Sequence, residues 1–220
     1  MIISRRRRYI FVHIPKTGGT SMALALEARA AADDILIGDT PKARARRGRL
    51  KGLEAPGRLW KHATLADIEG LVPEAEMAGM LVFALVRNPW DRMVSYYHWL
   101  RVQDFQHRAV ALARATDFAG FVAHPATARS LARWSYGAYL RDRAGVERPG
   151  LFLRLERLSE EMAPLAAHLG FLPELPRVNA SARRADWRGY YDDRTAERVA
   201  AICAEDIARF GYRFDPDGSA

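Results

Sequence analysis

Residues 13–21, His-Ile-Pro-Lys-Thr-Gly-Gly-Thr-Ser, combine the groups that a phosphate-like anion needs. Gly18 and Gly19 allow a tight turn that presents backbone N–H groups inward. A helix that begins here adds partial positive charge at its N-terminus. The side chains that add a full charge or a hydroxyl donor are Lys16, Thr17, Thr20 and Ser21. The segment therefore predicts a cradle for an anion.

The spacing differs from that of the nucleotide-triphosphatase loop, Gly-x-x-x-x-Gly-Lys-Ser/Thr, because Lys16 precedes both glycines. A purely structural alternative is a tight strand–helix turn, in which Thr20 or Ser21 acts as an ordinary helix cap.

A second segment, residues 86–97, begins where an apolar run ends and a helix starts. Arg87 follows that run directly, at the edge where open α/β sheets bind ligands. On the helix, Ser95 lies two turns after Asn88, so it can point the same way as Arg87. The two side chains could hold a second anionic group. Alternatively, Arg87 pairs with a local carboxylate and Ser95 faces the core.

Strand and helix patterns alternate along the chain. Expected strands are 9–13, 80–86 and 151–154, and expected helices are 20–32, 64–73, 89–103, 109–144, 159–168 and 195–209. This alternation predicts an α/β fold with a central parallel sheet flanked by helices in three layers. Residues 38–58, rich in glycine, proline and arginine, are expected to be an irregular, mobile basic loop.

Together the two segments resemble the nucleotide-dependent sulfotransferases. Residues 13–21 are similar to that family's 5′-phosphosulfate loop, and residues 87–97 are similar to its 3′-phosphate motif. The amino-acid sequence of the first motif is most similar to that of the carbohydrate branch of the family, which contains heparan sulfate 2-O-sulfotransferase. The resemblance continues more loosely through 154–158, 178–181 and 210–214.

The resemblance implies a P-loop-like sulfotransferase fold, with residues 1–220 as one domain. It also implies 3′-phosphoadenosine 5′-phosphosulfate (PAPS) as co-substrate, without a metal. The resemblance assigns to Lys16 the role of neutralising the bridging and leaving-group oxygens of PAPS. The residues that hold the 5′-phosphate and sulfate are then Lys16, Thr17, Gly18, Gly19, Thr20 and Ser21, and those that read the 3′-phosphate are Arg87 and Ser95. Arg183, Arg184 and Trp187 would form a lid over the adenine or the 3′-phosphate, unless that stretch is only a solvated basic segment.

A hydroxyl acceptor also needs a base, and His62 is the choice. It lies in residues 60–64, just before a capped helix, in an interval where the carbohydrate branch uses a histidine. An unperturbed imidazole titrates near pH 6.5. His13 is expected to be structural and His98 to be a packing residue, and the alternative base is a carboxylate such as Glu54.

The implied reaction moves the sulfuryl group from PAPS to a hydroxyl of a carbohydrate or small metabolite. Residues 38–58 and 104–145 are expected to form the acceptor side. One rival is a phosphotransferase or nucleotide hydrolase, which would need a metal-holding acid where the chain has Val86-Arg87. The other rival is a non-catalytic anion-binding module.

Composition sets outer limits. The chain has 220 residues, of which 49% are hydrophobic, which excludes wholesale disorder. Its net charge of +8 comes from 34 basic residues, all but four of them arginine, which suits a phosphate or sulfate ligand as well as an arginine-favouring genome. With one cysteine, Cys203, and no export signal or membrane-length apolar run, a cytoplasmic protein is expected. No nucleic-acid or membrane partner is expected, and the oligomeric state stays open.

Overall fold

The computed structural model describes residues 1–176, 184 and 186–215. The chain forms two compact units. The sheet unit comprises Met1–Val86 and Tyr136–Val178, and the helical unit comprises Arg87–Ser135 and Asn179–Ala220. Each has its own hydrophobic core. The single domain expected over residues 1–220 stays a prediction.

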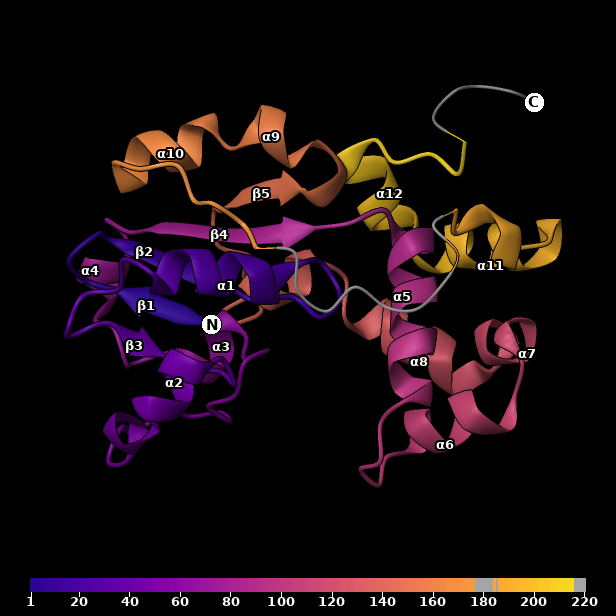
Figure 1. The fold of residues 1–220 in the computed structure, drawn as a ribbon, viewed down its shortest axis with the longest axis horizontal. Coiled ribbons are helices and arrows are strands. Elements are labelled where there is room, and N and C mark those ends of the chain that lie inside the picture. Colours follow the sequence, from indigo (N-terminus) through magenta and orange to yellow (C-terminus); the bar gives the residue numbers. More distant parts are fainter. Residues whose placement is uncertain (177–183, 185, 216–220) are drawn as a thin grey trace. The chain divides into compact units, whose positions relative to one another are not determined.

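The sheet unit contains five strands in the order β3-β1-β2-β4-β5 (Figure 1). Their bounds are β1 Ile2–Ser4, β2 Tyr9–Val12, β3 Ile35–Leu36, β4 Leu81–Val86 and β5 Leu151–Arg154. Strands β2, β4 and β5 are parallel, as the three expected strands require. Strand β1 pairs antiparallel with both β2 and β3 and makes the sheet mixed. These two strands were not expected, because two or three residues show no strand periodicity.

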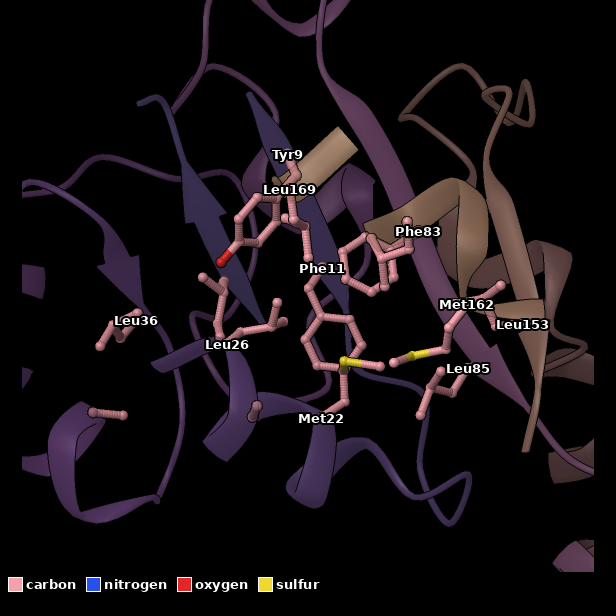
Figure 2. Packing of buried hydrophobic residues seen from close by; sticks show 14 residues of the cluster. Tyr9, Phe11, Met22, Leu26, Leu36, Phe83, Leu85, Leu153, Met162 and Leu169 are labelled. Carbon is pink, nitrogen blue, oxygen red and sulfur yellow. The ribbon is translucent and has the colours of Figure 1, made fainter. Parts of the chain in front are cut away.

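Both faces of this sheet are covered. Phe11 of β2 and Phe83 of β4 are paired in register, and both belong to a core cluster with residues of α1 and α10 (Figure 2). Side chains alternate along a strand, so Ile10 and Ala84 point to the opposite face, where they are fully buried too. The sheet unit is therefore a three-layer α/β structure, as the sequence predicts.

The helices of the sheet unit are α1 Gly19–Glu27, α2 Pro41–Ala45, α3 Leu65–Ile68, α4 Glu74–Met77, α9 Leu158–Glu161 and α10 Ala163–Leu169. Helix α1 ends before residue 32, because the chain turns toward β3 and Asp34 accepts a hydrogen bond from the Ala31 N–H at 2.8 Å. A capping box between Thr64 and Asp67 starts α3. That helix stops at Ile68, and α4 follows as a separate turn.

The expectation that residues 38–58 are irregular is wrong for residues 41–50, whereas residues 51–58 contain neither helix nor strand. Residues 41–50 contain α2, capped by Thr40, and a 3-10 helix at Arg47–Leu50. Three cationic side chains donate to carbonyl oxygens at or after the end of α1: Lys42 to Glu27, Arg46 to Ala31 and Arg49 to Ala32. Cations there oppose the negative end of the helix dipole, so the basic segment stabilises α1.

The helical unit consists of α5 Pro89–Arg101, α6 Arg108–Ala115, α7 Phe118–Ala123, α8 Pro125–Arg133, α11 Asp193–Ile202 and α12 Ala204–Phe210 (Figure 1). Tyr97, Phe121 and Val199 lie in its core. The helix expected over 195–209 is two helices, separated at Cys203. Across the described residues, no helix combines the length and apolar character that a membrane span requires.

Candidate functional site

The loop between β2 and α1 is the segment for which the sequence predicts an anion cradle. Lys16 and Gly18 adopt left-handed backbone conformations, with φ of 67° and 85°. Gly18 is the N-cap of α1 and provides no side-chain cap. The Ser21 N–H donates to the Gly18 carbonyl at 3.1 Å, so the N–H groups that the start of α1 leaves without a partner in the helix are those of Gly19 and Thr20. These N–H groups are therefore suited to an anion.

One expected ligand of the anion has a different local role. The hydroxyl of Thr17 is buried and donates to the carbonyl of Ile14 at 2.9 Å. It closes the turn between β2 and α1, so its proton is engaged within the protein. Thr20 and Ser21 are partly exposed at the start of α1.

Close packing also favours glycine at positions 18 and 19. A Cβ on Gly18 would lie 2.8 Å from Cδ1 of Leu155, and a Cβ on Gly19 would lie 2.1 Å from Cδ2 of His13. The imidazole of His13 thus lies directly against the first residue of α1. His13 is buried, as its expected structural role requires.

His62, the predicted base, contacts His13. Its Nδ1 lies 2.7 Å from the backbone oxygen of His13, and the two rings are 4.6 Å apart at 73°. A carbonyl oxygen only accepts, so Nδ1 carries the proton and donates it. Nε2 is then the atom of His62 that accepts a proton, as a general base requires.

Burial keeps both imidazoles neutral. It lowers the pKa of His62 to about 3, although the hydrogen bond to the His13 carbonyl raises it. Burial is the main cause that holds the pKa of His13 well below its usual value, and electrostatic repulsion by His62 is the second. An anion bound at the neighbouring loop would stabilise the imidazolium form and raise the pKa of His62.

This pair predicts a loss of stability in acid. The unfolded chain binds protons on these histidines below about pH 6.5, whereas the folded chain does not until about pH 3 for His62, so the free energy of unfolding falls as the pH drops through this window. At pH 5, one such histidine lowers the free energy of unfolding by about 2 kcal/mol relative to its value at neutral pH. In urea titrations at pH 7 and pH 5, His62→Gln should lose less stability than the wild type by about this amount. Equal losses in the two proteins would contradict the assignment.

Cationic groups surround this pair. The charges of Lys61 and Lys16 both contribute to lowering the pKa of His13. Lys61 also pairs with Asp39 at 2.6 Å, and Asp39 acts on His62 in the opposite sense. Glu54, the carboxylate alternative, is exposed, whereas Asp39 is the carboxylate whose charge reaches His62. Asp39 gave no sequence signal, because 23 positions separate it from His62.

In the helical unit, Arg87 and Asp91 form an ion pair. Nε and Nη2 of Arg87 lie 2.8 Å and 2.5 Å from Oδ2 of Asp91, one helical turn later. Asn88 caps α5 by accepting from the Trp90 N–H at 3.1 Å. Ser95 is buried. The local pairing considered for Arg87 is therefore present, and it fixes the guanidinium. The 3′-phosphate role of Arg87 and Ser95 stays a prediction.

The remaining candidates divide between packing and surface. His98 lies 5.4 Å from the ring of Tyr97 and 4.9 Å from that of Tyr190, in agreement with a packing role. Arg184 is exposed, and its backbone N–H donates to the Tyr190 hydroxyl at 3.2 Å. Arg183 lies outside the described residues. Within the described part of the chain, no group of three or more His, Cys, Asp or Glu side chains could hold a metal ion.

Comparison with known proteins identifies the architecture. No family model matches the chain, and no curated protein matches its sequence. Among solved structures, the mouse sulfotransferase SULT7A1 complexed with PAP is similar, with a TM-score of 0.51 over 93% of this chain and 85% of that one. The chain has the sulfotransferase fold. Sequence identity in this match is 16%, so the likeness concerns the fold. The fold class expected from the two motifs is confirmed.

Within the sulfotransferase fold of this chain, the first motif occupies the loop between β2 and α1, and the second opens α5. The structure brings His13, Gly19 and His62 together in the sheet unit.

Proposed function

We propose that the chain is a sulfotransferase that moves the sulfuryl group of PAPS to a hydroxyl of a carbohydrate or small metabolite. The observation that supports this most directly is the contact of His62 with His13, whose ring packs on Gly19 at the N-terminus of α1. A neutral base thus adjoins an anion cradle. The fold agrees, since the similar mouse protein is a sulfotransferase complexed with PAP.

In this proposal, the N–H groups at the start of α1 hold the 5′-phosphate and sulfate. Lys16 neutralises the oxygen between phosphorus and sulfur. Sulfuryl transfer resembles phosphoryl transfer, in which charge spreads over the transferred group, so positioned donors and a cation supply most of the catalysis.

The reaction forms one bond and breaks another. The acceptor oxygen attacks sulfur in line, the bond between sulfur and the bridging oxygen breaks, and adenosine 3′,5′-bisphosphate leaves with the electron pair. The hydroxyl proton passes to Nε2 of His62, which the His13 carbonyl orients through Nδ1.

Nucleotide binding tests the proposal. We propose that Arg87 and Ser95 bind the 3′-phosphate, with Arg183 and Arg184 closing over the nucleotide. Isothermal titration should show that adenosine 3′,5′-bisphosphate binds about 10- to 100-fold more tightly than 5′-AMP, because hydrogen bonds to charged groups contribute about 1.5–3 kcal/mol. Arg87→Ala should remove this preference, whereas the exposed Arg194→Ala should keep it. Equal affinities of the wild type for both nucleotides would refute the 3′-phosphate assignment.

The acceptor requires a direct assay. A transfer screen with sulfur-35-labelled PAPS over glycans and small hydroxyl metabolites should label at least one class. Labelling of oligosaccharides would support the carbohydrate branch that residues 13–20 resemble, and labelling of small metabolites alone would contradict that branch.

A further inference from the structure

Trp60 is an exposed aromatic side chain next to the proposed base. Its side chain is 41% exposed, which is unusual for a tryptophan. Its ring centroid lies 5.1 Å from that of His62, with the two planes at 88°.

The surroundings of His62 restrict where an acceptor can lie. Two aromatic rings pack on the imidazole, those of His13 and Trp60. His13 is 6% exposed, so its ring belongs to the protein interior. Trp60 is the solvent-accessible ring of the two. A molecule whose hydroxyl reaches Nε2 of His62 therefore has the Trp60 ring as its neighbour.

The charge beside this ring is positive. The guanidinium carbon of Arg58 lies 5.3 Å from the centre of the Trp60 ring. Between Pro41 and Trp60 the chain has seven basic residues and one acidic residue, Glu54. Lys42 and Arg46 act electrostatically on the carboxylate of Glu27, so part of this charge is compensated, but the basic residues remain in excess. This surface favours a negatively charged molecule.

We propose that Trp60 and Arg58 bind the acceptor, and that the acceptor is a ring compound with an anionic substituent. The ring lies on Trp60, and the anionic group pairs with Arg58. This inference rests on the proposed function, because it takes His62 as the base. Tryptophan offers a large, rigid contact face, and arginine a planar fork that matches a carboxylate or sulfate.

The test uses the full chain saturated with adenosine 3′,5′-bisphosphate and four probes. Methyl β-D-glucuronide and 4-hydroxybenzoate carry the anionic group on a sugar ring and an aromatic ring. Methyl β-D-glucoside and phenol are their neutral counterparts. Saturation-transfer NMR measures binding of each probe, and the two acidic probes distinguish a sugar acceptor from an aromatic one.

We expect at least one acidic probe to bind more tightly than its neutral counterpart. Trp60→Ala should weaken that probe about tenfold, Trp60→Phe should restore most of the affinity, and Arg58→Gln should remove the preference for the acidic probe. Matched controls are Leu172→Ala, an exposed apolar residue, and Arg29→Gln, whose guanidinium lies 4.9 Å from the Phe171 ring. Both controls should leave probe binding unchanged.

The outcomes separate two failures. If the wild type does not bind adenosine 3′,5′-bisphosphate, the proposed function fails, and this inference fails with it. If the nucleotide binds but Trp60→Ala and Arg58→Gln bind all probes as the wild type does, only the acceptor assignment is overturned. Preference for the neutral probes would overturn the anionic class.

Discussion

His62→Ala is expected to lower the turnover number of sulfuryl transfer by about 10²- to 10⁴-fold, the usual contribution of a positioned general base. The loss follows because Nε2 is the atom placed to take the hydroxyl proton, with Nδ1 committed to the His13 carbonyl. The affinity for adenosine 3′,5′-bisphosphate should stay close to that of the wild type. Steady-state kinetics and isothermal titration measure the two quantities.

A second substitution separates chemistry from structure. The amide of His62→Gln can still donate to the His13 carbonyl, but it cannot take up a proton, so this variant should fold and be as slow as His62→Ala. The exposed His168, whose Nε2 lies 2.9 Å from the Arg7 carbonyl oxygen, provides a control: His168→Ala should keep wild-type turnover. Wild-type turnover in His62→Gln would place the base elsewhere.

Lys16→Ala is expected to reduce turnover by about 10²- to 10³-fold, as the loss of one preorganised donor does at other charge-stabilising sites. The side chain is proposed to neutralise the leaving oxygen, where negative charge grows as the sulfur–oxygen bond breaks. The loss should therefore appear mainly in the turnover number, measured with saturating acceptor.

Backbone strain offers an alternative cause that can be tested directly. Lys16 has φ of 67°, a conformation that glycine adopts without cost. If the lysine charge matters, Lys16→Gly should be as slow as Lys16→Ala, and the exposed Arg6→Ala should match the wild type. Recovery of turnover in Lys16→Gly would show that loop conformation, and not charge, explains the effect.

Local signals in the sequence predicted much of the fold. Asn88 and Pro89 mark the start of α5, and Thr64 with Asp67 marks the start of α3, because a capping interaction needs only neighbouring residues. Strand β4 was recognisable as a continuous apolar run. The order within residues 38–58 was not predictable in this way, since it depends on carbonyl groups at the end of α1, ten or more positions earlier in the chain.

In the candidate site too, contacts between residues close in sequence were predictable and contacts between distant residues were not. The ion pair of Arg87 with Asp91 follows from their spacing of four. The contact of His62 with the His13 carbonyl joins residues 49 positions apart, and the packing of His13 on Gly19 depends on the exact path of the loop. Such contacts arise only when the sheet unit folds, so no local sequence pattern predicts them.

The space shared by His13 and Gly19 has an evolutionary consequence. A single mutation that adds even a methyl group at position 19 collides with the imidazole, and the carbonyl of that same histidine orients His62. Positions 13 and 19 can therefore drift only as a pair. In descendants of this chain, a bulkier residue at the start of α1 should appear together with a smaller one at position 13.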